Sequence, residues 1–297
     1  MAPTLTSQSA GSNYHQNRLY LRTPGVSNGI LHHGKVIRTA GFGYRNVQAK
    51  LEPGEHTIFH VASLSKAMTS MAVAALVNEG KFWWNSTVKS LLPEFCQKNL
   101  TIQQEATVTD LLAHRLGLTA QNQWLMQEHG RISVLQKETM PIVATLPRVY
   151  DFGSEFLYNN WGYCVAAVLI QRVSNLNWGE FLQENIFKPL GITRTTTVRN
   201  PEGDNIAKGY IALEDGSPFP NKWPYVSNGT IMSGAAGVQT TVHDLLQLYG
   251  AVLKASHDQF QIKTSSTEGS PLKELPTIMA SHMSIGDTST SGQSYRL

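Results

Sequence analysis

The sequence places Ser63 three residues before Lys66, at the start of an apolar segment. Residues three apart share one face of a helix, so we expect these side chains to be neighbours. A serine hydroxyl becomes a good nucleophile when a base takes its proton, and a partly desolvated lysine can be that base. Free N–H groups at a helix N-terminus would favour the developing negative charge. The same spacing at 86–89 and 270–273 opens no apolar helix, so it predicts no such chemistry.

A second group of polar residues, Tyr158, Asn159 and Asn160, precedes another apolar segment. One interpretation is structural, because asparagines before a helix are ordinary capping residues. The functional interpretation makes Tyr158 a second proton-transfer group beside Lys66. Asn160 would then hold Lys66 and the acyl carbonyl side of a substrate.

His114 follows Asp110 by four residues and invites a triad with Ser63. The alternative is that His114 ends a short helix and braces the loop beneath the site. A metal hydrolase has weak support, because His32, His33 and the scattered histidines lack a His-x-x-x-His spacing. We therefore expect no metal and no cofactor.

Composition limits the class of protein and its partners. The chain has 297 residues, of which 41% are hydrophobic, as in a globular protein, and its low net charge of +3 argues against disorder. The 24 Lys and Arg against 21 Asp and Glu form no block of like charge, so we expect no nucleic-acid partner. Two cysteines, Cys96 and Cys164, exclude a disulfide scaffold; a single bridge between them is the alternative to the two free thiols that we expect. The polar first residues contain no secretory signal and no segment could span a membrane, which predicts a cytoplasmic protein without a membrane partner.

The elements that would position these residues follow from hydrophobic patterning. Two strands, 26–31 and 35–44, flank the turn at His33 and Gly34 and predict an antiparallel hairpin. Thr241 is expected to cap the last of the helices. The predicted helices cover 63–79, 109–114, 161–173, 178–186 and 240–253. Strands followed by a long helical region indicate an α+β fold rather than alternating βαβ units.

We expect one domain over 24–297, preceded by an irregular N-terminus at 1–23. Residues 24–58 would form the sheet part, and 59–255 the mainly helical part with the active site. The polar segment 256–297 is expected to be a poorly ordered tail.

These segments, in this order, resemble the serine β-lactamase-like superfamily, in particular its class C β-lactamases, D-alanyl-D-alanine carboxypeptidases, esterases and acyltransferases. The Tyr-Asn-Asn-Trp-Gly-Tyr run at 158–163 is most similar to fungal members, some of which act in secondary metabolism. The matching blocks lie at 24–27, 41–44, 63–66, 92–95, 110–118, 158–160, 189–192, 236–238 and 244–246.

The resemblance implies a β-lactamase/transpeptidase-like fold and a role for each candidate site residue. Ser63 would be the acylated nucleophile and Lys66 its activating partner. Tyr158 would be the general base that also activates the incoming water or alcohol, and Asn160 would position the substrate. The backbone N–H of Ser63 would be one oxyanion donor.

The sequence departs from the family in its last part. The family's third motif, Lys-Thr-Gly or His-x-Gly, is not found after the helix at 240–253. We therefore expect a C-terminally truncated member whose sheet lacks its C-terminal strands. The predicted function is a serine hydrolase or acyltransferase that forms a Ser63 acyl-enzyme from a small-molecule ester, thioester or amide, in secondary metabolism. The alternative is a weak or inactive truncated pseudoenzyme. The oligomeric state stays open, as does the choice of acyl donor and acceptor.

Overall fold

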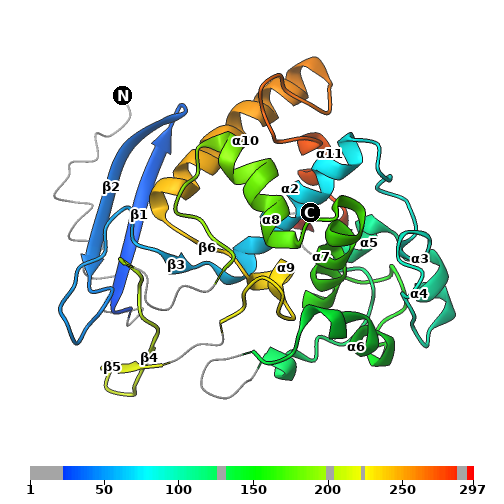
Figure 1. Cartoon of the computed structure of the whole chain (residues 1–297), viewed down its shortest axis with the longest axis horizontal. Coiled ribbons are helices and arrows are strands. Elements are labelled where there is room, and N and C mark those ends of the chain that lie inside the picture. Colours follow the sequence, from blue (N-terminus) through cyan, green and yellow to red (C-terminus); the bar gives the residue numbers. More distant parts are fainter. Residues whose placement is uncertain (1–22, 126–131, 199–203, 222–224, 286–292) are drawn as a thin grey trace.

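The computed structural model describes residues 23–125, 132–198, 204–221, 225–285 and 293–297. It has an N-terminal hairpin on one side, a long helix laid across it, and a helical body on the other side (Figure 1). This is the predicted α+β arrangement. The predicted irregular N-terminus lies outside the described residues, except for Thr23. The strands are β1 (Gly25–His32), β2 (Lys35–Gly43), β3 (Phe59–His60), β4 (Tyr210–Ala212), β5 (Pro218–Pro220), β6 (Gln239–Thr240), β7 (Met283–Ser284) and β8 (Ser294–Tyr295).

The predicted helices are present with small shifts of their ends, except that the last of them, α10, runs well beyond its predicted end. The helices are α2 (Ser65–Asn78), α3 (Val88–Leu91), α4 (Leu100–Glu105), α5 (Val108–Leu112), α6 (Thr139–Thr145), α7 (Asn160–Ser174), α8 (Trp178–Leu182), α9 (Ser233–Ala236), α10 (Val242–Ile262) and α11 (Leu275–Ile278). Short 3-10 turns lie at η1 (Ala62–Leu64), η2 (Asn122–Leu125), η4 (Gln136–Glu138) and η6 (Lys188–Leu190), and a π turn, η5 (Gln183–Phe187), extends α8.

The hairpin is antiparallel, with His32 opposite Lys35. Its two turn residues, His33 and Gly34, both have positive φ, which is the geometry of a tight hairpin turn. Among the described residues β1 pairs with β2 alone, and α10 covers one face of the pair. At Gly29 an added Cβ would lie 2.6 Å from Leu246 Cδ1, so this glycine allows the helix to approach the strand closely.

The prediction of a poorly ordered tail over 256–297 is wrong for the first half of that segment, which is folded against the body. Helix α10 continues to Ile262, and Thr241 caps its start by accepting from Asp244 N, as expected. The polar side chain of Gln259 is fully buried. Its amide nitrogen donates to the Leu272 carbonyl (2.9 Å) and its amide oxygen accepts from Leu275 N (2.9 Å), so neither polar atom is left unpaired. These bonds hold the segment that leads into α11 against α10. Polarity in the sequence therefore marked a hydrogen-bonded packing site rather than an unstructured segment.

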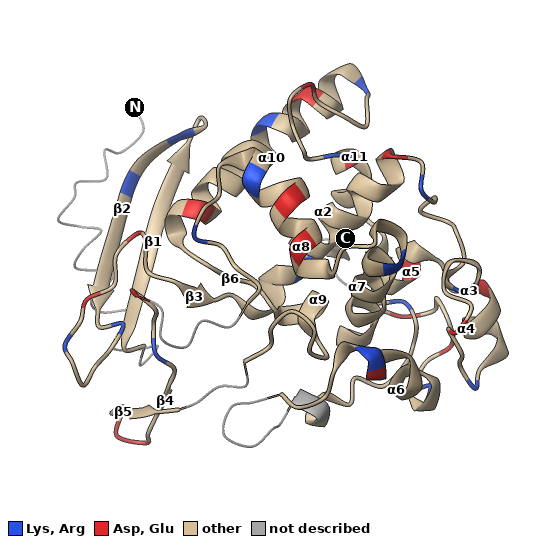
Figure 2. Ribbon diagram, in the orientation of Figure 1, with Lys and Arg blue, Asp and Glu red and all other residues tan. Residues whose placement is uncertain are grey.

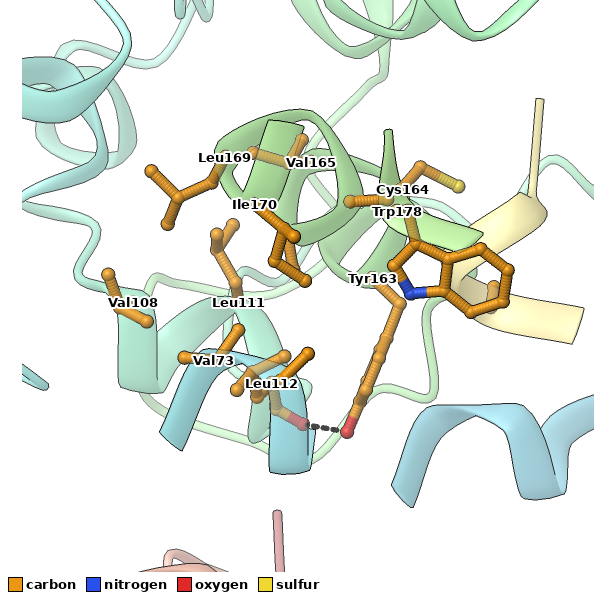
Figure 3. Close-up of a cluster of buried hydrophobic side chains, with 14 of the residues drawn as sticks. Val73, Val108, Leu111, Leu112, Tyr163, Cys164, Val165, Leu169, Ile170 and Trp178 are labelled. Carbon is orange, nitrogen blue, oxygen red and sulfur yellow. Dashed lines mark hydrogen bonds between the residues drawn. The ribbon is translucent and has the colours of Figure 1, made fainter. Parts of the chain in front are cut away.

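Helix α2 lies in the centre of the body and packs against α7, α8 and α9. Most of its side chains are buried on every face, so it needs polar partners for its buried hydroxyls. Thr69 Oγ1 accepts from Trp178 Nε1 (2.9 Å) and donates to the Gly234 carbonyl (2.7 Å). Figure 3 shows part of the apolar core, where side chains of α2, α5 and α7 meet and the buried Trp178 of α8 lies beside Cys164.

The surface carries charges of both signs in an interspersed pattern. Lys and Arg (blue) and Asp and Glu (red) are scattered over the ribbon rather than gathered by sign (Figure 2). Among the described residues no helix combines the length and the apolar character that crossing a bilayer requires. Both cysteines are free thiols, Cys164 buried and Cys96 exposed, as predicted.

Helices α5 and α7 touch at Gly162, which generates a stability prediction. An added Cβ at this position would lie 2.1 Å from the Leu111 carbonyl oxygen. We expect Gly162→Ala to lower the free energy of unfolding by about 3 kcal/mol, the upper end of the usual overpacking range. Gly54→Ala is the control, because its Cβ would meet nothing within 4 Å. Denaturant unfolding of both variants checks this, and equal midpoints would contradict the close approach.

Candidate active site

Ser63 stands where a short strand turns into the central helix. Strand β3 pairs with β6, and Val61 N donates to the Val238 carbonyl (3.3 Å), which fixes the chain just before the turn. The predicted helix start differs: Ser63 lies in the 3-10 turn η1, and α2 begins at Ser65. Ala62 has φ of +43°, a conformation that costs a non-glycine residue energy and is concentrated at functional sites. This turn leaves Ser63 exposed at the surface of the body.

Lys66 lies one turn into the helix and is only 4% exposed. Its Nζ donates to Ser63 Oγ (3.1 Å), Asn160 Oδ1 (2.8 Å) and the Ala235 carbonyl (3.0 Å). Three acceptors match the three N–H bonds of an ammonium group. Burial lowers the pKa of Lys66 from its ordinary value, because desolvation penalises the charged form. The amine is thus held in place and is easier to deprotonate than a surface lysine.

Tyr158 approaches Ser63 from the opposite element, the loop before α7. Its hydroxyl donates to Ser63 Oγ at 2.6 Å. Lys66 Nζ also lies 4.9 Å from the centre of the Tyr158 ring. The seryl oxygen therefore faces two groups that can carry protons.

Of the two asparagines, Asn159 is the capping residue and Asn160 is the one that contacts Lys66. Asn159 caps α7, with its Oδ1 accepting from Trp161 N (2.7 Å) and its amide donating to the Leu118 carbonyl (2.7 Å). Asn160 is the residue that faces Lys66, and its Nδ2 donates to Asn122 Oδ1 (2.9 Å). Because the amide nitrogen of Asn160 has its own acceptor, its oxygen is oriented toward the lysine.

The triad of Ser63, His114 and Asp110 is not formed. The Asp110 carboxylate accepts from Thr107 N (2.9 Å) in a capping box at the start of α5, and it forms an ion pair with Arg115. His114 Nδ1 accepts from Asn159 N (3.0 Å). His114 lies just beyond the end of α5 with φ of +58°, as expected for a residue that ends a helix and braces a loop.

Sequence reasoning missed two groups of the site. Asn122 orients Asn160 from a distant turn, and nothing in the spacing of the sequence marks it. The Ala235 carbonyl is a main-chain group, so no side-chain pattern could indicate it. The block at 236–238 is nevertheless close by: Val238 N donates to Ser65 Oγ at 3.0 Å and ties β6 to α2. Among the described residues no group of three or more His, Cys, Asp or Glu is arranged to hold a metal ion.

Comparison with curated proteins finds relatives that are longer than this chain. Protein flp of Staphylococcus aureus (strain MW2) is 28% identical over 204 residues, which is 67% of this chain and 40% of that protein. The putative penicillin-binding protein PbpX of Bacillus subtilis (strain 168) is 25% identical over 257 residues, 84% of this chain and 57% of PbpX. The chain thus spans about two fifths to three fifths of these relatives.

Solved structures share the fold. The octameric penicillin-binding protein homologue from Pyrococcus abyssi superposes with a TM-score of 0.81 at 23% identity, covering 98% of this chain and 64% of that chain. A penicillin-binding protein from Bacillus halodurans gives a TM-score of 0.71 at 21% identity, covering 91% and 80%. The sequence model of the family described as Beta-lactamase matches residues 16–291. The chain therefore belongs to the beta-lactamase family and has its fold, as the motifs in the sequence indicated.

Proposed function

We propose that this chain carries out serine acyl transfer through an acyl-enzyme on Ser63. The observation that carries the proposal is that one seryl oxygen accepts hydrogen bonds from both Lys66 Nζ (3.1 Å) and Tyr158 Oη (2.6 Å). A nucleophile within reach of its base, with a third group orienting that base, is the arrangement that covalent catalysis needs. Here the third group is Asn160.

Acylation moves one proton from the nucleophile to the leaving group. Neutral Lys66 accepts the Ser63 proton while Oγ forms a bond to the acyl carbon. Tyr158 donates its hydroxyl proton to the leaving heteroatom as the bond from carbon to that atom breaks, and the Lys66 proton restores Tyr158. The backbone N–H of Ser63 is one donor to the oxyanion, and the loss of such a donor costs about 10²–10³-fold.

Deacylation is the reverse of this sequence, with water or an alcohol in the place of the leaving group. Lys66 first takes the hydroxyl proton of Tyr158, and the resulting tyrosinate accepts the proton of the incoming O–H as that oxygen attacks the acyl carbon. The Lys66 proton then passes to Ser63 Oγ as the bond between Oγ and the acyl carbon breaks. Water gives hydrolysis, and an alcohol gives transfer. The same side chains serve both outcomes, so pocket shape and acceptor supply decide between them.

The substrate class follows from this chemistry. Esters, thioesters and amides all present an acyl carbon to Ser63, and the names of the penicillin-binding relatives add β-lactams as acylating probes. Transfer from a thioester to an alcohol in secondary metabolism is the finer form of the proposal. A panel of thioesters with and without an alcohol acceptor distinguishes transfer from hydrolysis.

The first test is covalent labelling. Incubation with a fluorophosphonate probe or a fluorescent penicillin should add one adduct, which peptide mass spectrometry places on Ser63, and Ser63→Ala should abolish it. Ser86→Ala is the matched control, because Ser86 has the same spacing to Lys89 but Lys89 Nζ donates to the Pro93 and Phe95 carbonyls instead. A folded wild-type protein that none of these probes labels would contradict the proposal and support the inactive alternative.

The second test concerns the charge state of Lys66. Only the neutral amine accepts a proton, so the labelling rate should rise with pH until the amine is deprotonated. Because burial lowers the pKa of Lys66, the rise should be complete at a lower pH than for an ordinary lysine. Lys66→Arg keeps the charge but has no accessible neutral form, so labelling should fall by about 10²–10⁴-fold and lose this rise.

The control for this variant is Lys89→Arg, which should retain the rate and the pH profile. The comparison is made on folded protein with far-UV circular dichroism matched to wild type. If Ser63 in Lys66→Arg is labelled at the wild-type rate at every pH, the lysine is not the base.

A further inference from the structure

A short chain of polar contacts links the last described strand to the floor of the site. His114 Nε2 lies 3.1 Å from Tyr295 Oη in β8. Tyr295 Oη lies 3.4 Å from Tyr163 Oη, and the Tyr163 hydroxyl donates to the Leu112 carbonyl at 3.0 Å. This last bond is the dashed line in Figure 3. The hydrogen bonds of the Ser63 side chain go to Lys66 and Tyr158, and none of these three side chains takes part in them.

The direction of these bonds is determined at both ends. The Leu112 carbonyl can only accept, so the Tyr163 hydroxyl donates its one hydrogen to that carbonyl. Toward Tyr295 the Tyr163 hydroxyl can then only accept. At the other end a main-chain N–H, that of Asn159, donates to His114 Nδ1, so this nitrogen carries a lone pair. A neutral imidazole then has its hydrogen on Nε2 and donates it to Tyr295. Both ends require the same tautomer of His114.

The imidazole is neutral and enclosed. His114 is 1% exposed, and burial lowers its pKa to about 3, with the nearby Lys66 charge acting in the same direction. Its ring centre lies 4.7 Å from that of Tyr295 and 4.5 Å from that of Tyr158. His114 therefore contacts the site at two points: its ring packs on Tyr158, and its Nδ1 accepts from the main-chain N–H of Asn159, the residue between Tyr158 and Asn160.

We propose that Tyr295 is a positioning residue for the active site and acts through His114. By accepting the Nε2 hydrogen it fixes the ring and tautomer of His114, which hold Asn159 N and thereby Tyr158 and Asn160 against Ser63 and Lys66. The inference deepens the proposed function and rests on it for its kinetic consequence. It also makes residues near the end of the described chain part of the site.

The first experiment removes only the hydroxyl. Tyr295→Phe keeps the ring but leaves the buried His114 Nε2–H without an acceptor, and we expect the rate of Ser63 labelling to fall roughly tenfold. Tyr249→Phe, an exposed tyrosine of α10, is the control. A role in stability alone would lower the melting temperature and leave the labelling rate of the folded protein unchanged, which would overturn the proposal.

A double-mutant cycle tests whether the effect passes through His114. In His114→Asn the side-chain oxygen can replace Nδ1 as the acceptor for Asn159 N–H, and asparagine tolerates the positive φ found here. The shorter side chain no longer meets Tyr295. Tyr295→Phe should therefore change the labelling rate by less than about twofold in this background. Losses that multiply in the double variant would contradict the pathway.

A spectroscopic measurement separates this inference from the proposed function. In uniformly ¹⁵N-labelled wild-type protein, His114 should show an unprotonated Nδ1 and a slowly exchanging Nε2–H. In Tyr295→Phe that proton should exchange faster and the Asn159 amide resonance should shift. Unchanged signals would overturn the inference even in an active enzyme. If the probes do not react with Ser63 of the wild type but Tyr295→Phe still changes these signals, the proposed function is wrong and the hydrogen-bond chain is retained.

Discussion

The site depends on the burial of one amine. Lys66 is 4% exposed, and a buried amine is tolerated only when its hydrogens meet acceptors. Those acceptors come from three places in the chain: Ser63 in η1, Asn160 at the start of α7, and the Ala235 carbonyl in α9. The packing of α2 against α7 and α9 is therefore tied to the geometry of the site. A shift of any of these elements would leave a polar group unpaired in the core.

The same constraint connects stability to reactivity. Desolvation lowers the pKa of Lys66, so the packing that encloses the amine raises the fraction of it that is neutral and able to accept a proton. The strained φ of Ala62 places Ser63 at the surface while Lys66 stays inside. A nucleophile open to substrate and a base shielded from water are both products of one turn between β3 and α2.

Local features of this structure could be predicted from the sequence, and long-range ones could not. The hairpin, the main helices, the Thr241 cap and the closeness of Ser63 to Lys66 follow from periodicity and spacing. Tyr158 and Asn160 were candidates from their own local pattern, but only the family resemblance supported their place beside Lys66, because no spacing brings residues more than 90 positions apart together. The hydrogen bonds of Gln259 and the orientation of Asn160 by Asn122 depend on packed side chains from separate elements. His114 was ambiguous for the same reason, since its partners at Asn159 and Tyr295 are distant in sequence.

The central claim is that Ser63 Oγ is served by two proton carriers, so that Tyr158 acts in both halves of the reaction. Stopped-flow measurement of p-nitroaniline release from an acyl p-nitroanilide tests this most directly, because the leaving nitrogen has to be protonated; wild type and Tyr158→Phe are compared. The account predicts that the first-turnover rate and the steady-state rate both fall by about 10²–10⁴-fold in Tyr158→Phe. A first-turnover rate that is unchanged in Tyr158→Phe would contradict the claim.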